Sequence, residues 1–266
     1  MSKITKFLKR SYITLILIIF YIPILFGAIF SFNKYDAGAK GDIKVTKWNG
    51  MDLGSFKAIT TQGRGDALIN SIILGVIVSL IVAVVTLLTT YALWKQKNRT
   101  YKAIVEGTSN IPLINPDVIT AVSLSLIFSV MFGTLSFESD GMWRAITAHV
   151  TIILPFGILI AYPRSSKFSA SMMEASRDLG YNSFKTWFKT YFRFMMPITI
   201  AVIAISITLS FDDFILTRTV SNTSTIGTKL YEGSFKGWAL ALGTILMFIT
   251  MLGSLIFALI KRRKNA

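Results

Sequence analysis

Long apolar runs separated by short polar stretches dominate the pattern along this chain of 266 residues. A helix needs about 20 consecutive apolar residues to cross the hydrocarbon core of a bilayer. Six segments meet or nearly meet this length, and no stretch is left over for a separate soluble domain. They are residues 11–32, 67–94, 111–132, 142–162, 197–216 and 238–260. The pattern predicts an all-α polytopic membrane protein, with six transmembrane helices in one domain spanning residues 1–266.

Two prolines interrupt the start of the third apolar segment, in the stretch SNIPLINPDV. Pro112 and Pro116 each lack a backbone N–H and disfavour a helical conformation of the preceding residue. A broken helix at membrane depth is tolerated where neighbouring protein or water satisfies the freed carbonyl groups. We therefore expect this helix to be broken near its start and to lie inside the bundle.

The basic residues predict the orientation of the chain. Of the 28 lysines and arginines, four lie in residues 3–10, four in 95–102, six in 164–193 and four in 261–264. Lysine and arginine accumulate in cytoplasmic loops, so both termini are expected on the cytoplasmic side of a bacterial plasma membrane. Residues 33–66 then form an irregular outer loop, with a short helix expected near residues 53–59.

Composition excludes several classes of function. The formal charge of +15 follows the predicted topology, so no basic patch on a soluble domain remains for nucleic acid. The chain has no cysteine and one histidine, His149, which leaves no constellation for a metal site or a catalytic site. No Gly-Lys pair occurs, so the phosphate-binding loop of ATPases is absent. We expect neither an enzyme nor a resident cofactor, and we read His149 as a hydrogen-bonded interior residue.

A polar, basic segment, EASRDLGYNSFKTWFKTYFRFMMP, lies between the fourth and fifth apolar runs, at residues 174–197. Ser171 and Glu174 have the spacing of a capping box, which predicts the start of a short helix. Gly180 suits the left-handed end of that helix, and Asn182 or Ser183 can cap a second helix over residues 184–195. Residues 163–196 are therefore expected to contain a helix-turn-helix elbow. On physical grounds alone, two amphipathic helices lying on anionic lipid headgroups are the favoured explanation of this segment.

The order of residues in this elbow resembles a family motif. Glu174-Ala175-Ser176 followed by Asp178-Leu179-Gly180, with Pro197 beyond, resembles the EAA motif of permease subunits in binding-protein-dependent ABC importers. The chain departs from the motif in three places: Ser176 stands for alanine, Tyr181 for a small residue, and Phe192-Arg193 for a leucine-proline pair. The segment HVTIILP at 149–155, the triplet 211–213 and residues 231–240 resemble the spermidine/putrescine (PotC) type of permease. The similarity runs from about Ala67 onward.

This resemblance implies an assembly and a docking site. The implied fold is the MetI-like permease fold, in which the cytoplasmic elbow docks into a groove on a partner ATPase. The implied partners are a second, homologous permease, two ATPase subunits that bind ATP and Mg, and an extracytoplasmic polyamine-binding protein. The residues implied in coupling to the ATPase are Glu174, Ala175, Asp178, Leu179 and Gly180.

Acidic residues at membrane depth are costly and usually face a cavity or a partner. Asp117, Asp212 and Asp213 are such residues in this chain. A polyamine has several ammonium groups joined by methylene chains, so its path should offer spaced carboxylates and aromatic faces. We predict a substrate path of Asp117, Asp212, Asp213, Phe211, Phe214 and Trp48. The alternatives are that Asp117 caps a helix and that Asp212 and Asp213 pair with Arg218 at the interface.

Two other transport functions fit the same pattern less well. An ABC permease for an anionic solute would need a basic residue in the core of a span, where we see none. An ion-coupled secondary carrier commonly has two related halves with paired broken helices, whereas only the third segment here is plainly broken. A polyamine importer is therefore the favoured function.

Overall fold

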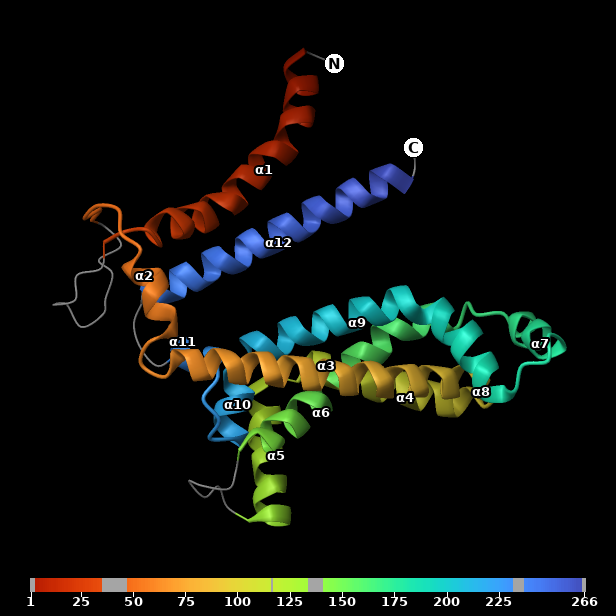
Figure 1. The fold of residues 1–266 in the computed structure, drawn as a ribbon. Coiled ribbons are helices and arrows are strands. Elements are labelled where there is room, and N and C mark those ends of the chain that lie inside the picture. The colour runs from red at the N-terminus through yellow and green to blue at the C-terminus, as the bar shows by residue number, and fades with distance from the viewer. Residues whose placement is uncertain (1–2, 35–46, 116, 134–140, 232–236, 265–266) are drawn as a thin grey trace. The chain divides into compact units, whose positions relative to one another are not determined.

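The computed structural model describes residues 3–34, 47–115, 117–133, 141–231 and 237–264, almost all of which are helical (Figure 1). The β contact found in these ranges is an isolated bridge between Asn33 and Met51. The expected all-α class is confirmed. The chain divides into two compact units, residues 1–65 with 232–266 and residues 66–231.

The first unit contains α1 (Lys3–Phe30), α2 (Gly54–Lys57), the 3-10 turn η1 (Ala58–Thr60) and α12 (Gly237–Lys264). Helix α12 packs against both α1 and α2. The Asn33 side chain fixes the segment that follows α1, because its Nδ2 donates to the Lys47 carbonyl (2.9 Å) and its Oδ1 accepts from the Asn49 N–H (2.8 Å). The short helix expected near residues 53–59 is present as α2 and η1. Residues 35–46 of the outer loop lie outside the described ranges.

The second unit is built on three long helices, α3 (Arg64–Lys95), α6 (Met142–Ser165) and α9 (Arg193–Asp212). The three helices meet at Gly157 of α6. A Cβ atom at this glycine would lie 2.5 Å from Thr86 Oγ1 and 3.1 Å from Val82 Cγ1 of α3, and 3.4 Å from Val202 Cγ1 of α9. The absence of a side chain at Gly157 is what lets the three helices approach one another.

Two further helices, α4 (Arg99–Ile114) and α5 (Asp117–Phe132), occupy the region of the third apolar segment. Asn98 caps α4, because its Oδ1 accepts from the N–H groups of Thr100 and Tyr101. Helix α4 continues through residue 112 and ends at Ile114, so the helix is not broken at the first proline of the stretch. Asn115, the residue before the second proline, is extended, with φ −75° and ψ 133°.

Four helical stretches in the described residues are long and apolar enough to cross a membrane. They are Arg64–Lys95, Met142–Ser165, Ser183–Asp212 and Gly237–Ile256. Two shorter apolar helices, Thr14–Phe30 and Asp117–Phe132, lie within the first and third predicted segments. The predicted end of the fifth segment at residue 216 is wrong, because α9 stops at Asp212 and Asp213 is extended, with ψ 120°.

Candidate functional site

The chain bends sharply after α9. The Asp213 carboxylate accepts a hydrogen bond from the Leu216 N–H (2.8 Å), in the first turn of the short helix α10 (Ile215–Val220). An aspartate that binds the backbone in this way favours a new helix start over continuation of the old helix. Helix α10 then packs against α5 and α6, and α11 (Ile226–Tyr231) contacts α9 and α10.

A cavity of about 400 Å³ opens at this bend. Its volume lies within the range of small-molecule sites in proteins. Three carboxylates line it: Asp117 from the first turn of α5, Asp212 from the last turn of α9, and Asp213 from the bend. The remaining lining residues are His149, Ile152, Ile153, Phe156, Thr208, Leu209, Phe214, Ile215, Leu216 and Tyr231.

One wall of the cavity is aromatic. The rings of Phe214 and Tyr231 are stacked, with centroids 4.2 Å apart and an interplanar angle of 11°. On α6, His149 is buried and its Nε2 lies 3.0 Å from Thr217 Oγ1 of α10. The expectation of a hydrogen-bonded interior histidine is therefore confirmed, and His149 also holds α10 against α6.

The segment that carries the bend is anchored to the start of α3. Asn70 Nδ2 donates to the Ser224 carbonyl (3.0 Å), and the Ile226 N–H donates to Ser71 Oγ (2.8 Å). Gly227 of α11 lies against the bend itself, since a Cβ atom there would be 2.7 Å from the Asp213 carbonyl oxygen. Close backbone packing at Gly227 thus fixes the position of Asp213.

Of the six residues predicted for a substrate path, the structure brings four to this cavity: Asp117, Asp212, Asp213 and Phe214. Phe211 does not line it. Trp48 belongs to the first compact unit, where its ring meets Phe30 edge to face at 5.8 Å. As the alternative reading expected, Asp117 stands in the first turn of a helix.

Sequence reasoning missed Tyr231 and Arg144. Tyr231 is 17 positions from its stacking partner Phe214, and no periodicity relates the two. Arg144 is buried at the start of α6, and its guanidinium donates to the Gly133 carbonyl at the end of α5 (3.0 Å). A basic residue within the first turn of the predicted segment 142–162 was the available signal for Arg144.

At the opposite end of α9 lies the predicted elbow. Helix α7 (Ala170–Asp178) is followed by its C-cap Leu179 and then by Gly180, which has φ +79°, the left-handed conformation that the sequence predicted. The Gly180 N–H donates to the Arg177 carbonyl (2.8 Å) and the Tyr181 N–H to the Ser176 carbonyl (3.4 Å). These two bonds form a Schellman motif, which satisfies the last carbonyl groups of α7.

The second half of the elbow starts at α8 (Ser183–Thr186), which Asn182 caps by accepting from the Lys185 N–H (2.8 Å). The chain then passes through a π-helical turn, η2 (Trp187–Phe192), directly into α9. The predicted capping box of α7 is wrong. The helix starts one residue after Ser169, and the Ser169 and Ser171 hydroxyls contact each other at 2.6 Å.

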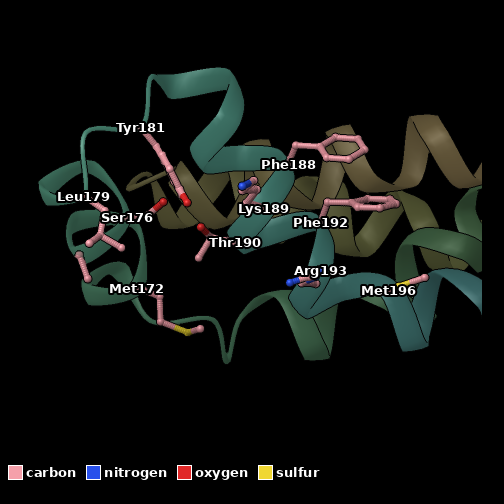
Figure 2. Close-up of a pocket in the computed structure, with 11 residues that line it drawn as sticks. Met172, Ser176, Leu179, Tyr181, Phe188, Lys189, Thr190, Phe192, Arg193 and Met196 are labelled. Atoms are coloured by element: carbon pink, nitrogen blue, oxygen red, sulfur yellow. The ribbon is translucent and has the colours of Figure 1, made fainter.

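A groove of about 780 Å³ lies between α7 and η2 (Figure 2). Ala175 and Leu179 of the motif line it, and Leu179 is 75% exposed. Glu174, Asp178 and Gly180 are also exposed, whereas Ser176 faces inward, toward Thr186. The five predicted coupling residues therefore share the accessible side of the elbow.

Lysines flank this groove. The ammonium groups of Lys185 and Lys189 lie 4.8 and 4.9 Å from the centroid of the Tyr181 ring. A tyrosine face stabilises nearby cations, so Tyr181 holds two positive charges at the edge of the groove. The departure from the family motif at this position thus gives the elbow a basic margin.

The carboxylates described above do not form a metal centre. Within the described ranges, no group of three or more histidine, cysteine or acidic side chains is arranged to hold a metal ion.

Comparison with known proteins identifies the family. Residues 87–265 match the model of the binding-protein-dependent transport system inner membrane component. The chain belongs to this family. Its members are transport permeases of the inner membrane, and the four long apolar helices make this chain a multi-pass member.

Two PotC permeases are similar over nearly the whole chain, and a PotI permease is similar over 41% of it. A spermidine/putrescine transport system permease protein PotC homolog of Mycoplasma genitalium is 34% identical over 263 residues, 96% of this chain and 91% of the relative. The PotC protein of Escherichia coli K12 is 28% identical over 267 residues, 98% of this chain and 97% of the relative. A putrescine transport system permease protein, PotI of the same organism, is 33% identical over 111 residues.

Proposed function

We propose that this chain is the permease subunit of an ATP-driven ABC importer for polyamines such as spermidine and putrescine. The observation that carries the proposal is the cavity at the end of α9, where Asp117, Asp212 and Asp213 meet beside the stacked rings of Phe214 and Tyr231. Carboxylates pair with the ammonium groups of a polyamine, and aromatic faces suit its methylene chain and its cations. The names of the similar permeases support the same class of substrate.

In this proposal the elbow couples transport to ATP hydrolysis. Glu174, Ala175, Asp178, Leu179 and Gly180 form the surface that docks on a partner ATPase, which binds ATP and Mg. The exposure of these residues and the groove beside Ala175 and Leu179 support this role. Closure of the ATPases moves the elbow and, through α9, the walls of the cavity.

The complete importer contains a second, homologous permease, two ATPase subunits and an extracytoplasmic polyamine-binding protein. Six helices cross the membrane, with the elbow and both termini on the cytoplasmic side. The distribution of lysine and arginine along the sequence supports this orientation. Phe211 and Trp48 belong to the wider substrate path, outside the cavity of the second unit.

The test is uptake of radiolabelled spermidine into proteoliposomes that contain the chain with its partner subunits and binding protein. The double variant Asp212→Asn and Asp213→Asn should lower uptake at least about tenfold while the ATPase still copurifies. Asp66→Asn is the matched control, because Asp66 is an exposed acid of the same unit that does not line the cavity. Normal uptake by the double variant would contradict the proposed path.

A second variant tests docking of the elbow on the ATPase. Gly180→Asp should abolish copurification of the ATPase without preventing membrane insertion, since an aspartate tolerates the turn less well than glycine and adds a charge to the docking surface. Accumulation driven by an ion gradient, without ATP or the ATPase, would instead indicate a secondary carrier.

A further inference from the structure

Three buried hydroxyl groups meet where the elbow joins the helix bundle. Tyr191 of η2 is 0% exposed, and its hydroxyl lies 2.8 Å from Ser165 Oγ at the end of α6 and 3.2 Å from Thr90 Oγ1 near the end of α3. Ser165 Oγ also donates to the Thr90 carbonyl (3.0 Å). The Tyr191 hydroxyl therefore bonds to two long helices at once, and we call this group of three residues the hydroxyl cluster.

Aromatic rings enclose the hydroxyl cluster. The rings of Tyr91, Trp94 and Phe168 lie 4.8, 6.5 and 5.3 Å from that of Tyr191. Trp94 Nε1 donates to the Phe168 carbonyl (2.9 Å), which ties the loop before α7 to α3. Hydrogen bonds in such an apolar enclosure are strong, and losing one partner leaves the others buried and unsatisfied.

The π-helical turn η2 lets both Tyr191 and Thr186 point inward, although they are five positions apart. Along α9 and back into the elbow, buried residues follow at Ser206, Val202, Met195 and Tyr191, with intervals of four and seven residues that suit an α-helix. The next buried residue is Thr186, five positions before Tyr191, which is the spacing of a π-turn. In an unbroken α-helix, Trp187 would take the inward position.

The position of Thr186 fixes the rest of the elbow. Its Oγ1 donates to the Tyr181 carbonyl (3.4 Å) and accepts from Ser176 Oγ of α7 (3.5 Å). The shift of register at η2 thus lets one helix face bind α7 through Thr186 and bind α3 and α6 through Tyr191.

The geometry points to Tyr191 as a positioning residue for coupling: its hydroxyl joins the elbow to α3 and α6, so that the elbow and these helices move as one rigid body. This inference rests on the proposed function, in which movement of the elbow drives transport. Without the bonds to Ser165 and Thr90, the elbow can turn against the bundle, and ATP hydrolysis continues with less movement of the cavity walls. Tyr191 touches neither nucleotide nor substrate in this role.

Rigidity can be measured without reference to any substrate. Spin labels at Ser183→Cys on the elbow and Leu88→Cys on α3 report their separation in the complete importer, and the chain has no other cysteine. Both positions are exposed. We expect one narrow distance distribution, unchanged by ATP, in the otherwise unmodified chain. With Tyr191→Phe added, the distribution should broaden or shift when ATP is supplied.

Uptake of radiolabelled spermidine per ATP hydrolysed should fall about tenfold in Tyr191→Phe, with ATPase copurification unchanged, because the lost bonds are fully buried. Ser165→Ala, which removes a partner from the other side, should have the same effect. The matched control is Tyr101→Phe, which removes the hydroxyl of an exposed tyrosine on α4.

Two results would overturn the inference: an unchanged, narrow distance distribution in Tyr191→Phe, or uptake per ATP equal to that of the control. Failure of the proposed function gives a different pattern. In that case the unmodified importer takes up no spermidine, while the distance measurement still decides whether the hydroxyl cluster holds the elbow rigid.

Discussion

Gly180 is required by the conformation of its backbone and not by lack of space. Its φ is +79°, and a Cβ atom there would meet nothing within 4 Å. The strain of a left-handed non-glycine residue, about 1 kcal/mol, should therefore be the whole effect of Gly180→Ala. We expect ATPase binding to weaken about fivefold, measured by titration of the solubilised permease with the ATPase.

Gly107→Ala serves as the control, because Gly107 lies within α4 with open space around it and a helical alanine is favourable. Equal ATPase affinity in the two variants would refute the claim that the turn geometry matters for docking.

At Gly227, in contrast to Gly180, glycine is required by lack of space for a side chain and not by the backbone conformation. Gly227→Ala forces either α11 or the Asp213 carbonyl to move, at a cost of about 1–3 kcal/mol. Spermidine uptake should fall several-fold while ATPase binding stays normal, because the elbow lies at the other end of α9. Uptake and ATPase copurification measured on the same preparation separate the two effects. A variant with full uptake would show that the bend tolerates displacement.

The sequence predicted the acidic residues that line the cavity. Acidic side chains beside apolar runs are conspicuous because burial of a charge is costly, which identified Asp117, Asp212 and Asp213. The stacking of Tyr231 on Phe214 and the contact of His149 with Thr217 could not be predicted, because both depend on how α10 and α11 fold back on the bundle. That path is set by long-range contacts such as the hydrogen bond from the Ile226 N–H to the Ser71 hydroxyl, and such contacts carry no signal in a single sequence.

Among the elements, the contact of α3, α6 and α9 at Gly157 should be the most sensitive to added volume. Gly157→Ala places a methyl group 2.5 Å from Thr86 Oγ1 and should destabilise the chain by about 1–3 kcal/mol. The thermal unfolding midpoint of the detergent-solubilised protein measures this loss.

Gly75→Ala is the matched substitution, since its Cβ atom would meet Ile207 at an ordinary 3.7 Å. We expect its midpoint to stay level or rise through the better helix propensity of alanine. A similar fall in both variants would mean that loss of helix flexibility, and not crowding, is responsible.

Apolar length predicted where the long helices lie, and local chemistry predicted some of their ends. The caps at Asn182 and Gly180 follow from properties that these residues have in any protein. The π-turn at residues 187–192 and the end of α9 at Asp212 were not predicted, because neither position carries a glycine, a proline or a change in apolar length. The helix α4 escaped notice because its mixed polar sequence has neither the apolar length of a span nor a break before Ile114.

At the scale of the whole molecule, the cavity and the elbow lie at opposite ends of one helix. Helix α9 has 20 residues, so about 30 Å separate the two sites along its axis. The proposed topology puts them at opposite faces of the membrane. With Phe184→Cys, a membrane-impermeant maleimide should label the chain only in inside-out vesicles, because Phe184 is 76% exposed on the elbow.

Met51→Cys, exposed in the proposed outer loop, should give the reverse labelling pattern and serves as the companion measurement. The natural chain contains no cysteine, so neither signal has a background. Labelling of both positions from the same side would contradict the proposed topology.

The abrupt end of α9 at the cavity has an electrostatic consequence of its own. The last turn of a helix leaves carbonyl oxygens without partners inside the helix, and its macrodipole places about half a negative charge there. Asp212 stands in that last turn, so the cavity is electronegative through the backbone as well as through its carboxylates. This part of the attraction cannot be removed by substituting side chains. A cavity stripped of its aspartates should therefore still prefer a cation to an anion.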